Sequence, residues 1–149
     1  MDGYELATDR ARLDLRAIHA YLVRSYWSPG IPFEIVERAV NNSLCFGVYE
    51  TTGGAQVGFT RVVTDYATFA YLCDVYVLEE HRGHGLSKLM MREALGHPAL
   101  AGARRVMLAT RDAHGLYRQS GFVVAGAGGN LMEIVRPDFY NGPAAFKTA

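Results

Sequence analysis

The spacing of apolar residues changes along the chain. Two stretches, 11–22 and 33–40, carry apolar residues at the three- and four-residue intervals of an amphipathic helix. Between residues 43 and 78, apolar and polar positions alternate in three runs, and turn residues separate the runs at 51–54 and 64–66. Such alternation is typical of strands joined by tight turns. The first half of the chain therefore predicts two helices followed by an antiparallel meander.

The flanking residues set the expected boundaries of the two helices. A short strand is expected at 4–7, and Thr8 or Asp9 is then the expected cap of the first helix. Proline and glycine at 29–30 end that helix, and Pro32 suits the first turn of the second, which two asparagines close. Polar residues off the apolar stripe of the first helix are expected to form its solvated face: Arg12, Arg16 and His19.

The second half of the chain alternates helices and strands. A helix is expected to end near 96–98, a strand to cover 105–110, and a short helix to cover 114–120. The continuous apolar centre of the strand predicts burial on both faces, and 131–135 is expected to form a last strand. The fold class is α+β, with one mixed, mostly antiparallel sheet flanked by about four helices. Residues 1–149 are expected to form a single domain.

Charge and composition narrow the classes of partner. Fifteen basic and fifteen acidic residues cancel, so no overall field favours nucleic acid or an anionic membrane. No apolar run reaches the roughly 20 residues of a membrane helix, and the first residues lack a signal-peptide pattern. Two reduced, buried thiols are favoured over a disulfide for Cys45 and Cys73, and the spacing of His and Cys predicts no metal site. We expect a cytoplasmic protein without a nucleic-acid or membrane partner.

A strand, a glycine loop and a helix follow one another between residues 73 and 94. Gly83 and Gly85 remove side chains where the helix begins, so the first backbone N–H groups are exposed, and Arg82 adds a positive charge beside them. The stretch predicts a phosphate site. A P-loop is excluded because no lysine follows Gly85 directly, and a dinucleotide loop because Lys88 stands where a third glycine is required.

A second motif follows about thirty residues later. Residues 116–122 read Leu-Tyr-Arg-Gln-Ser-Gly-Phe, and residues 82–87 read Arg-Gly-His-Gly-Leu-Ser. With these two motifs the chain resembles the GCN5-related N-acetyltransferase (GNAT) superfamily, whose signatures are Arg/Gln-x-x-Gly-x-Gly/Ala and Leu/Phe-Tyr-x-x-x-Gly-Phe. Ser87 stands where the family has glycine or alanine, and Thr110 where many members have asparagine. The resemblance covers roughly residues 44–122 and implies the acyl-CoA N-acyltransferase fold.

The resemblance implies a direct transfer of the acetyl group of acetyl-CoA to a primary amine, without a metal. In the family, the pyrophosphate binds the loop amides and the pantetheine arm pairs with the backbone of the preceding strand. A backbone N–H near Val75 is expected to stabilise the oxyanion. The residues expected to bind the cofactor are Val75, Tyr76, Val77, Arg82, Gly83, His84, Gly85, Leu86, Ser87, Thr110 and His114.

Tyr117 is the expected general acid, which protonates the departing CoA thiolate. Reference pKa values of about 10 for tyrosine and about 8.5 for a thiol make that transfer only slightly uphill. A tyrosine that merely packs the short helix is the alternative. Asp74 is the expected general base, with Glu34 in reserve, and the alternative for both carboxylates is a substrate anchor.

The acceptor is expected across the sheet from CoA, between the first two helices, near Tyr26, Trp27, Ser28, Phe33 and Glu34, with Tyr71 and Tyr76 as further candidates. Aromatic side chains around a loop broken by proline and glycine predict a small pocket. The alternative is that Trp27 and Phe33 only pack the helices together. A small-molecule amine and a protein amine both remain open as acceptors.

Two expectations concern other kinds of partner or function. Members of the family often pair through their sheets, so a homodimer is one expected assembly. The alternative function is a non-catalytic acyl-CoA-binding sensor or partner-binding domain that keeps the glycine loop without turnover.

Overall fold

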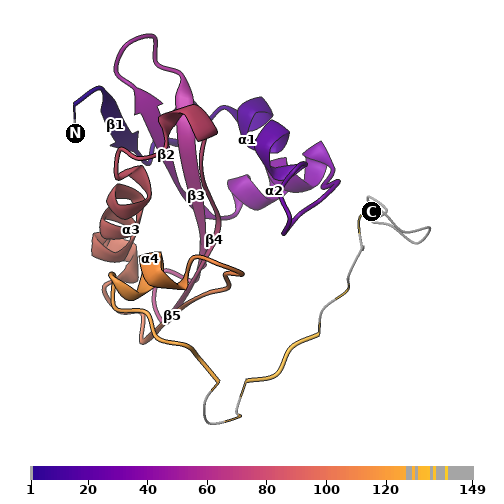
Figure 1. Cartoon of the computed structure of the whole chain (residues 1–149). Coiled ribbons are helices and arrows are strands. Elements are labelled where there is room, and N and C mark those ends of the chain that lie inside the picture. Colours follow the sequence, from indigo (N-terminus) through magenta and orange to yellow (C-terminus); the bar gives the residue numbers. More distant parts are fainter. Residues whose placement is uncertain (1, 127–128, 130, 135, 137–139, 141–149) are drawn as a thin grey trace.

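The computed structural model describes residues 2–126, 129, 131–134, 136 and 140 (Figure 1). Its main elements are, in chain order, β1 (Tyr4–Ala7), α1 (Leu15–Leu22), α2 (Phe33–Asn41), β2 (Leu44–Glu50), β3 (Gln56–Thr64), β4 (Phe69–Val77), α3 (Leu86–Gly96), β5 (Arg105–Leu108) and α4 (His114–Arg118). Three 3-10 turns lie between them: η1 (Arg10–Arg12), η2 (Glu79–His81) and η3 (Pro98–Leu100). The predicted order up to the short helix is confirmed.

The strands form one sheet in the order β1-β2-β3-β4-β5. The first three pairs are antiparallel and the pair β4–β5 is parallel. Short turns join β2 to β3 and β3 to β4, whereas α1 and α2 lie between β1 and β2. The parallel pair needs a crossover, which α3 supplies. The predicted mixed, mostly antiparallel sheet is confirmed.

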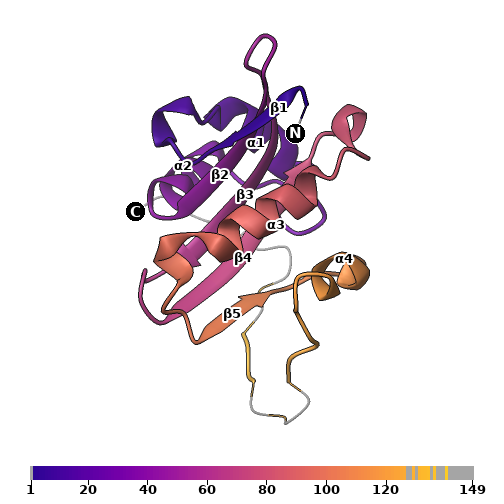
Figure 2. The same ribbon diagram turned by 90° about the vertical axis from the view of Figure 1, so that its left-hand side faces the viewer.

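Helices cover both faces of the sheet. Figures 1 and 2 show α3 on one face and α1 with α2 on the other. Side chains alternate along β2, so that Leu44, Phe46 and Val48 enter the core under α3 and Cys45 enters the core under α1 and α2. This agrees with the amphipathic pattern of the sequence, in which each helix has one apolar face.

The first helix begins later than the sequence predicts. Asp9 caps η1 by accepting a hydrogen bond from the Ala11 N–H at 2.9 Å. Asp14 caps α1 by accepting one from the Ala17 N–H at 3.0 Å. The expectation that Thr8 or Asp9 caps this helix is therefore wrong, because η1 separates Asp9 from α1.

The assignment of His19 to a solvated face is also wrong. Arg12 and Arg16 are exposed as expected, whereas His19 is half-buried. Its Nε2 lies 2.9 Å from the Ile31 carbonyl oxygen, and its ring contacts Phe33 edge-on at 5.6 Å. The imidazole therefore links α1 to the start of α2.

The chain after α3 departs from its predicted strands. β5 is four residues long and half-buried in its apolar part, because it is the last strand of the described sheet and has one neighbour. Residues 131–134 form no strand, and the Met132 side chain is 97% exposed. The expectation of a last strand is wrong for these four residues, and Val135 lies outside the described residues.

Candidate active site

The loop between β4 and α3 presents a row of backbone N–H groups. Gly83 and Gly85 have φ values of +83° and +73°, which a β-carbon disfavours. Gly85 caps α3, and no N–H from residue 83 to 88 donates to an acceptor in the described part of the chain. A cavity of about 210 Å³ lies against the loop. Because these amides stand at the positive end of the α3 dipole, the loop is suited to an anion. We call residues 83–88 the anion loop.

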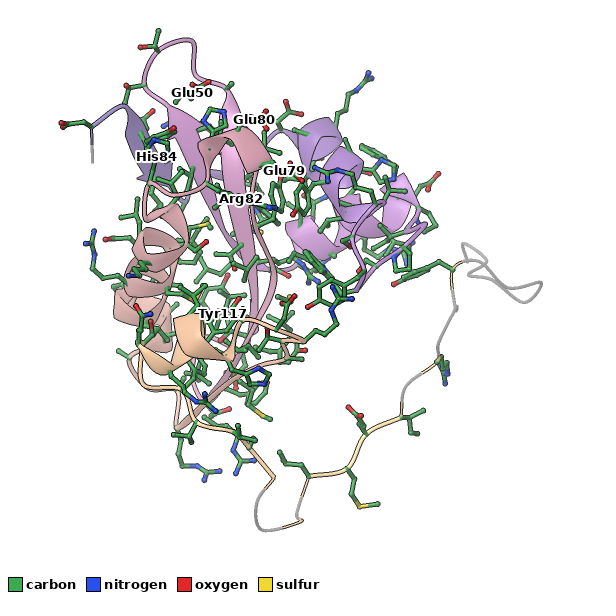
Figure 3. All side chains as sticks on the ribbon, viewed as in Figure 1. Glu50, Glu79, Glu80, Arg82, His84 and Tyr117 are labelled. Atoms are coloured by element: carbon green, nitrogen blue, oxygen red, sulfur yellow. The ribbon has the colours of Figure 1, made fainter. Side chains whose placement is uncertain are left out.

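Arg82 braces this loop. Its Nε donates to the Val77 carbonyl oxygen at 3.1 Å, and its Nη2 donates to the Tyr21 hydroxyl at 3.1 Å. Glu79 lies beside it (Figure 3), and two hydrogen bonds from the Arg24 guanidinium, at 2.8 and 3.1 Å, lower the pKa of the Glu79 carboxyl to about 2. Arg82 is thus first a positioning residue for the anion loop, and its half-exposed side chain leaves it accessible to a ligand.

The remaining loop residues divide into two groups. Leu86 and Ser87 line the loop cavity, and Leu86 also enters the core beneath α3. His84 does not line the cavity. Its Nδ1 lies 3.1 Å from the His81 carbonyl oxygen, and its ring packs on Tyr4 at 5.4 Å. His84 therefore supports the loop from the side of β1.

The backbone of β4 has a free edge next to this loop. The pairing of β4 with β5 ends at Leu72. On the β3 side, the Leu78 N–H donates to the Val57 carbonyl oxygen at 2.9 Å. Because adjacent residues of an antiparallel ladder alternate in direction, Val75 and Val77 direct their backbone groups away from β3. The backbone of Tyr76 faces β3, and its buried side chain packs under α1, stacked on Tyr21 at 3.9 Å.

Asp74 occupies a bulge in β4. The register with β3 shifts opposite Thr60, and Asp74 has a φ of +54°. Its Oδ2 accepts a hydrogen bond from Arg61 Nε at 2.7 Å, and its Oδ1 accepts one from Trp27 Nε1 at 3.1 Å. Arg61 also donates to the Ser43 hydroxyl at 3.1 Å. With side-chain exposures of 8% for Asp74 and 19% for Arg61, this is a buried ion pair.

One cavity brings the two predicted catalytic side chains together. It has a volume of about 320 Å³ and lies where β4 and β5 part. Asp74 and Tyr117 line it, together with residues of the loop that joins α1 to α2. The complete lining is Tyr26, Trp27, Tyr71, Leu72, Cys73, Asp74, Val75, Leu108, Ala109, Thr110, Arg111, Asp112, Ala113 and Tyr117. We call this space the transfer cavity.

Tyr117 lies on α4 and is 8% exposed (Figure 3). Its ring contacts Phe122 edge-on, with the ring centroids 6.0 Å apart, so the two aromatic residues of the second motif pack against each other. Burial raises the pKa of the Tyr117 hydroxyl above its ordinary value. That hydroxyl makes no hydrogen bond to another described residue and is available to a ligand in the transfer cavity.

The other predicted residues lie at varying distances from this centre. Thr110 lines the cavity and accepts a hydrogen bond from the Ala113 N–H at 3.0 Å, which fixes the turn before α4. His114 is exposed at the start of α4 and lines a neighbouring cavity. Phe33 and Glu34 belong to α2 and do not line the transfer cavity, whereas Tyr26, Trp27 and Tyr71 do.

Two arginines of the site were not predicted from the sequence. Arg61 is a charged residue among the apolar residues of β3, and a search for an opposite charge on the next strand would have found Asp74. No comparable sequence pattern indicates a role for Arg111. Its N–H donates to the Tyr26 hydroxyl at 3.3 Å, and its guanidinium carbon lies 3.9 Å from the Tyr26 ring centroid. These residues are 85 positions apart, so only the fold brings them together.

Both cysteines are free in the structure, as the sequence predicts. Burial raises the pKa of the Cys45 thiol to about 11 and that of the Cys73 thiol to about 12. Since only the thiolate is reactive, a disulfide dye at pH 8 is expected to label the folded protein about a hundredfold more slowly than the protein unfolded in guanidinium. Absorbance at the dye's released thiolate measures this difference. Rapid labelling of the cysteines in the folded chain would contradict the expected protection.

In the described part of the chain, no three side chains of His, Cys, Asp or Glu gather into a possible metal site. Among the same residues, none of the helices has the length and apolarity to cross a bilayer.

Known proteins resemble the chain in both sequence and structure. The family model described as "Acetyltransferase (GNAT) family" matches residues 9–122. A Gibberella zeae protein, named as a candidate acetyltransferase, is 39% identical over 131 residues, which cover 73% of this chain and 72% of that protein. A Xanthomonas campestris crystal structure, described as a candidate acetyltransferase of the same family, is 47% identical with a TM-score of 0.90, and covers 95% of this chain and 99% of its own.

A more distant structure shows the shared fold alone. Glucosamine-6-phosphate N-acetyltransferase from Arabidopsis thaliana is 13% identical, with a TM-score of 0.63 and coverage of 91% of this chain and 98% of its own. The family match spans the anion loop, the free edge of β4 and Tyr117. The chain belongs to the acetyltransferase (GNAT) family.

Proposed function

We propose that the protein is an acetyl-CoA-dependent N-acetyltransferase that transfers the acetyl group directly to a primary amine. The observation that carries this proposal is the transfer cavity, which is lined both by Val75, at the free edge of β4, and by Tyr117. The anion loop lies at the end of the same strand. A single extended thioester can therefore be held at one end by its phosphates and along its arm by backbone groups.

Each part of the cofactor has a proposed partner. The pyrophosphate binds the N–H groups from Gly83 to Lys88, and the residues there leave space for it because Gly83 has no protein atom near its β-carbon position. The pantetheine arm pairs with the outward-facing backbone of Val75 and with the N–H of Val77, whose carbonyl oxygen already accepts a hydrogen bond from Arg82. The N–H of Val75 donates to the thioester oxygen, which becomes negative when the amine attacks.

Tyr117 is the proposed general acid. Tyr117 lines the cavity, and its hydroxyl has no hydrogen-bond partner among the described residues. A tyrosine of ordinary pKa is already protonated at neutral pH, and burial raises the pKa of Tyr117 further. When the tetrahedral adduct collapses, the C–S bond breaks and the CoA sulfur takes the proton of the hydroxyl. The nitrogen of the new amide gives its extra proton to solvent, and the tyrosinate recovers a proton from solvent.

Asp74 is better suited to positioning than to the expected role of general base. Both of its oxygens already accept hydrogen bonds, and Arg61 balances its charge. We propose that it fixes the β4 bulge and places Trp27 in the cavity wall. The amine then loses its proton to water at the cavity mouth before it attacks.

Gly83→Ala tests whether acetyl-CoA binds at the anion loop. A β-carbon at Gly83 meets no protein atom, but it stands where the phosphate must approach the backbone. We expect acetyl-CoA to bind at least about tenfold more weakly, which corresponds to about 1.4 kcal/mol. Isothermal titration calorimetry measures the dissociation constant.

Gly53→Ala is the matched control. Gly53 has the same φ of +83° and the same open surroundings, but it lies in the turn between β2 and β3. The conformational strain of the substitution is therefore similar, and cofactor affinity should stay unchanged. Equal affinities for the Gly83→Ala and unmodified proteins would reject the anion loop as the cofactor site.

A non-catalytic acyl-CoA sensor is the second candidate, because the anion loop alone would serve binding. The two functions differ in turnover. Thiol release from acetyl-CoA in the presence of an amine supports the enzyme. Thermal stabilisation by acetyl-CoA without thiol release from any amine would favour the sensor.

A further inference from the structure

The transfer cavity has a roof made by two loops. Tyr26, in the loop between α1 and α2, accepts a hydrogen bond from the Arg111 N–H, which belongs to the loop between β5 and α4. The Arg111 guanidinium stacks on the Tyr26 ring at 3.9 Å. We call this pair of contacts the clasp. Because it ties the loops together across the cavity, an extended polypeptide cannot lie in the space between them unless the clasp opens.

Four aromatic side chains line the cavity beneath the clasp. Tyr26 and Trp27 contact one another edge-on at 5.1 Å, and Tyr71 and Tyr117 contribute two further rings to the lining. A volume of about 320 Å³ must also accept the thioester end of the cofactor, and it lies at the small end of the range for ligand pockets. The space left for an acceptor therefore suits a compact, apolar body that packs on ring faces.

The charges around the cavity balance. Arg61 pairs with the buried carboxylate of Asp74 at 2.7 Å, and Arg111 lies 3.9 Å from Asp112 at the exposed mouth. No described acid in the depth of the cavity is left without a basic partner. A polycation would find too few carboxylates there, and the carboxylate of an amino acid would have to take Arg111 from the clasp.

A cavity lined by aromatic rings favours an acceptor that carries a single amino group. A single ammonium is attracted to ring faces on entry. A cavity of low polarity then disfavours the charged form and lowers the pKa of the bound amine. The site can thereby produce the free amine that attacks the thioester, although Asp74 is already paired.

We propose that the acceptor is a small monoamine with an aromatic or other apolar body, bound beneath the clasp, and not a polypeptide, an amino acid or a polyamine. This inference rests on the proposed N-acetyltransferase function. It adds the chemical class of the acceptor, and it gives Arg111 and Tyr26 the role of selecting that acceptor.

A panel of amines compared by thiol release tests the class. The probes are 2-phenylethylamine, phenylalanine (the same amine with a carboxylate), spermidine and a peptide whose lysine is its free amine. We expect kcat/KM for 2-phenylethylamine to exceed each of the others by at least about tenfold. A higher value for phenylalanine, spermidine or the peptide would overturn the proposal.

The panel also separates this inference from the function on which it rests. Turnover of the peptide or spermidine without turnover of 2-phenylethylamine leaves the enzyme intact and removes the acceptor class. No turnover of any amine, with acetyl-CoA still raising the melting temperature, removes the N-acetyltransferase function itself.

Arg111→Ala tests the clasp directly. Opening the roof should raise KM for 2-phenylethylamine and narrow its preference over the peptide by about tenfold or more, while the affinity for acetyl-CoA stays the same. Arg104→Ala removes an exposed arginine just before β5 and serves as the control. An unchanged preference in Arg111→Ala would show that the clasp does not select the acceptor.

Discussion

Replacement of Tyr117 by phenylalanine is expected to lower kcat by about a hundredfold, at the low end of the range for general acid catalysis. The effect is at that end because a thiolate is already a fair leaving group. The substitution keeps the edge-on contact with Phe122 and removes only the hydroxyl. Thiol release at saturating acetyl-CoA and amine measures kcat, and calorimetry should show unchanged affinity for acetyl-CoA.

The pH dependence follows from the direction of the pKa shift. Burial raises the pKa of Tyr117, so its acid form persists above the ordinary tyrosine value of about 10. The rate should therefore show no loss of this acid between pH 7 and 9, and the midpoint of any decline that this acid causes should lie above pH 10. A decline with a midpoint below pH 9 that disappears in Tyr117→Phe would show that burial does not set the pKa of this hydroxyl.

Tyr71→Phe is the control that separates proton donation by Tyr117 from the general effect of removing a hydroxyl from the cavity. It removes a second hydroxyl from the same cavity, and Tyr71 has no proposed proton to transfer. We expect it to lower kcat less than Tyr117→Phe does. Equal losses in both variants would mean that general polarity of the cavity, and not protonation by Tyr117, supports the reaction.

The sequence predicted the parts of the site that depend on local chain geometry. Gly83 and Gly85 lie two residues apart in sequence, and their backbone freedom shapes the loop without help from distant residues. Tyr117 reaches the cavity because only the short loop 109–113 separates its helix from β5. The alternating pattern of β2 likewise determined the faces of the sheet. In β4 the bulge at Asp74 shifts the alternation, so that Val77 shares a core with Ala70 and Leu72.

The parts that were missed depend on distant contacts. Arg61 meets Asp74 across two strands, and Arg111 meets Tyr26 across 85 residues. Asp74 stood in an alternating strand, and the sequence did not predict the bulge that gives it a φ of +54°. The start of α1 was misplaced for a related reason, because two aspartates five residues apart each suit a cap and the intervening turn decides between them.

The buried ion pair leads to the largest expected loss of stability. Arg61→Ala leaves Asp74 buried, with the Trp27 indole as its remaining side-chain donor among the described residues. Breaking a buried pair in this way typically costs about 3–5 kcal/mol. Urea unfolding followed by circular dichroism should show that loss. Trp27 is the single tryptophan of the chain, so its emission reports on the cavity wall and should shift to longer wavelength.

A second substitution separates charge from packing. Arg61→Met with Asp74→Asn removes both charges, keeps a carbonyl oxygen for Trp27, and should restore much of the stability that Arg61→Ala loses. Arg24→Ala is the control, since the Arg24–Glu79 pair has similar distances but stands half-exposed in solvent, where an ion pair contributes little. If Arg24→Ala and Arg61→Ala destabilise the protein equally, burial does not determine the strength of these pairs. If the double variant is as unstable as Arg61→Ala, the uncompensated charge of Asp74 is not the cause of the loss.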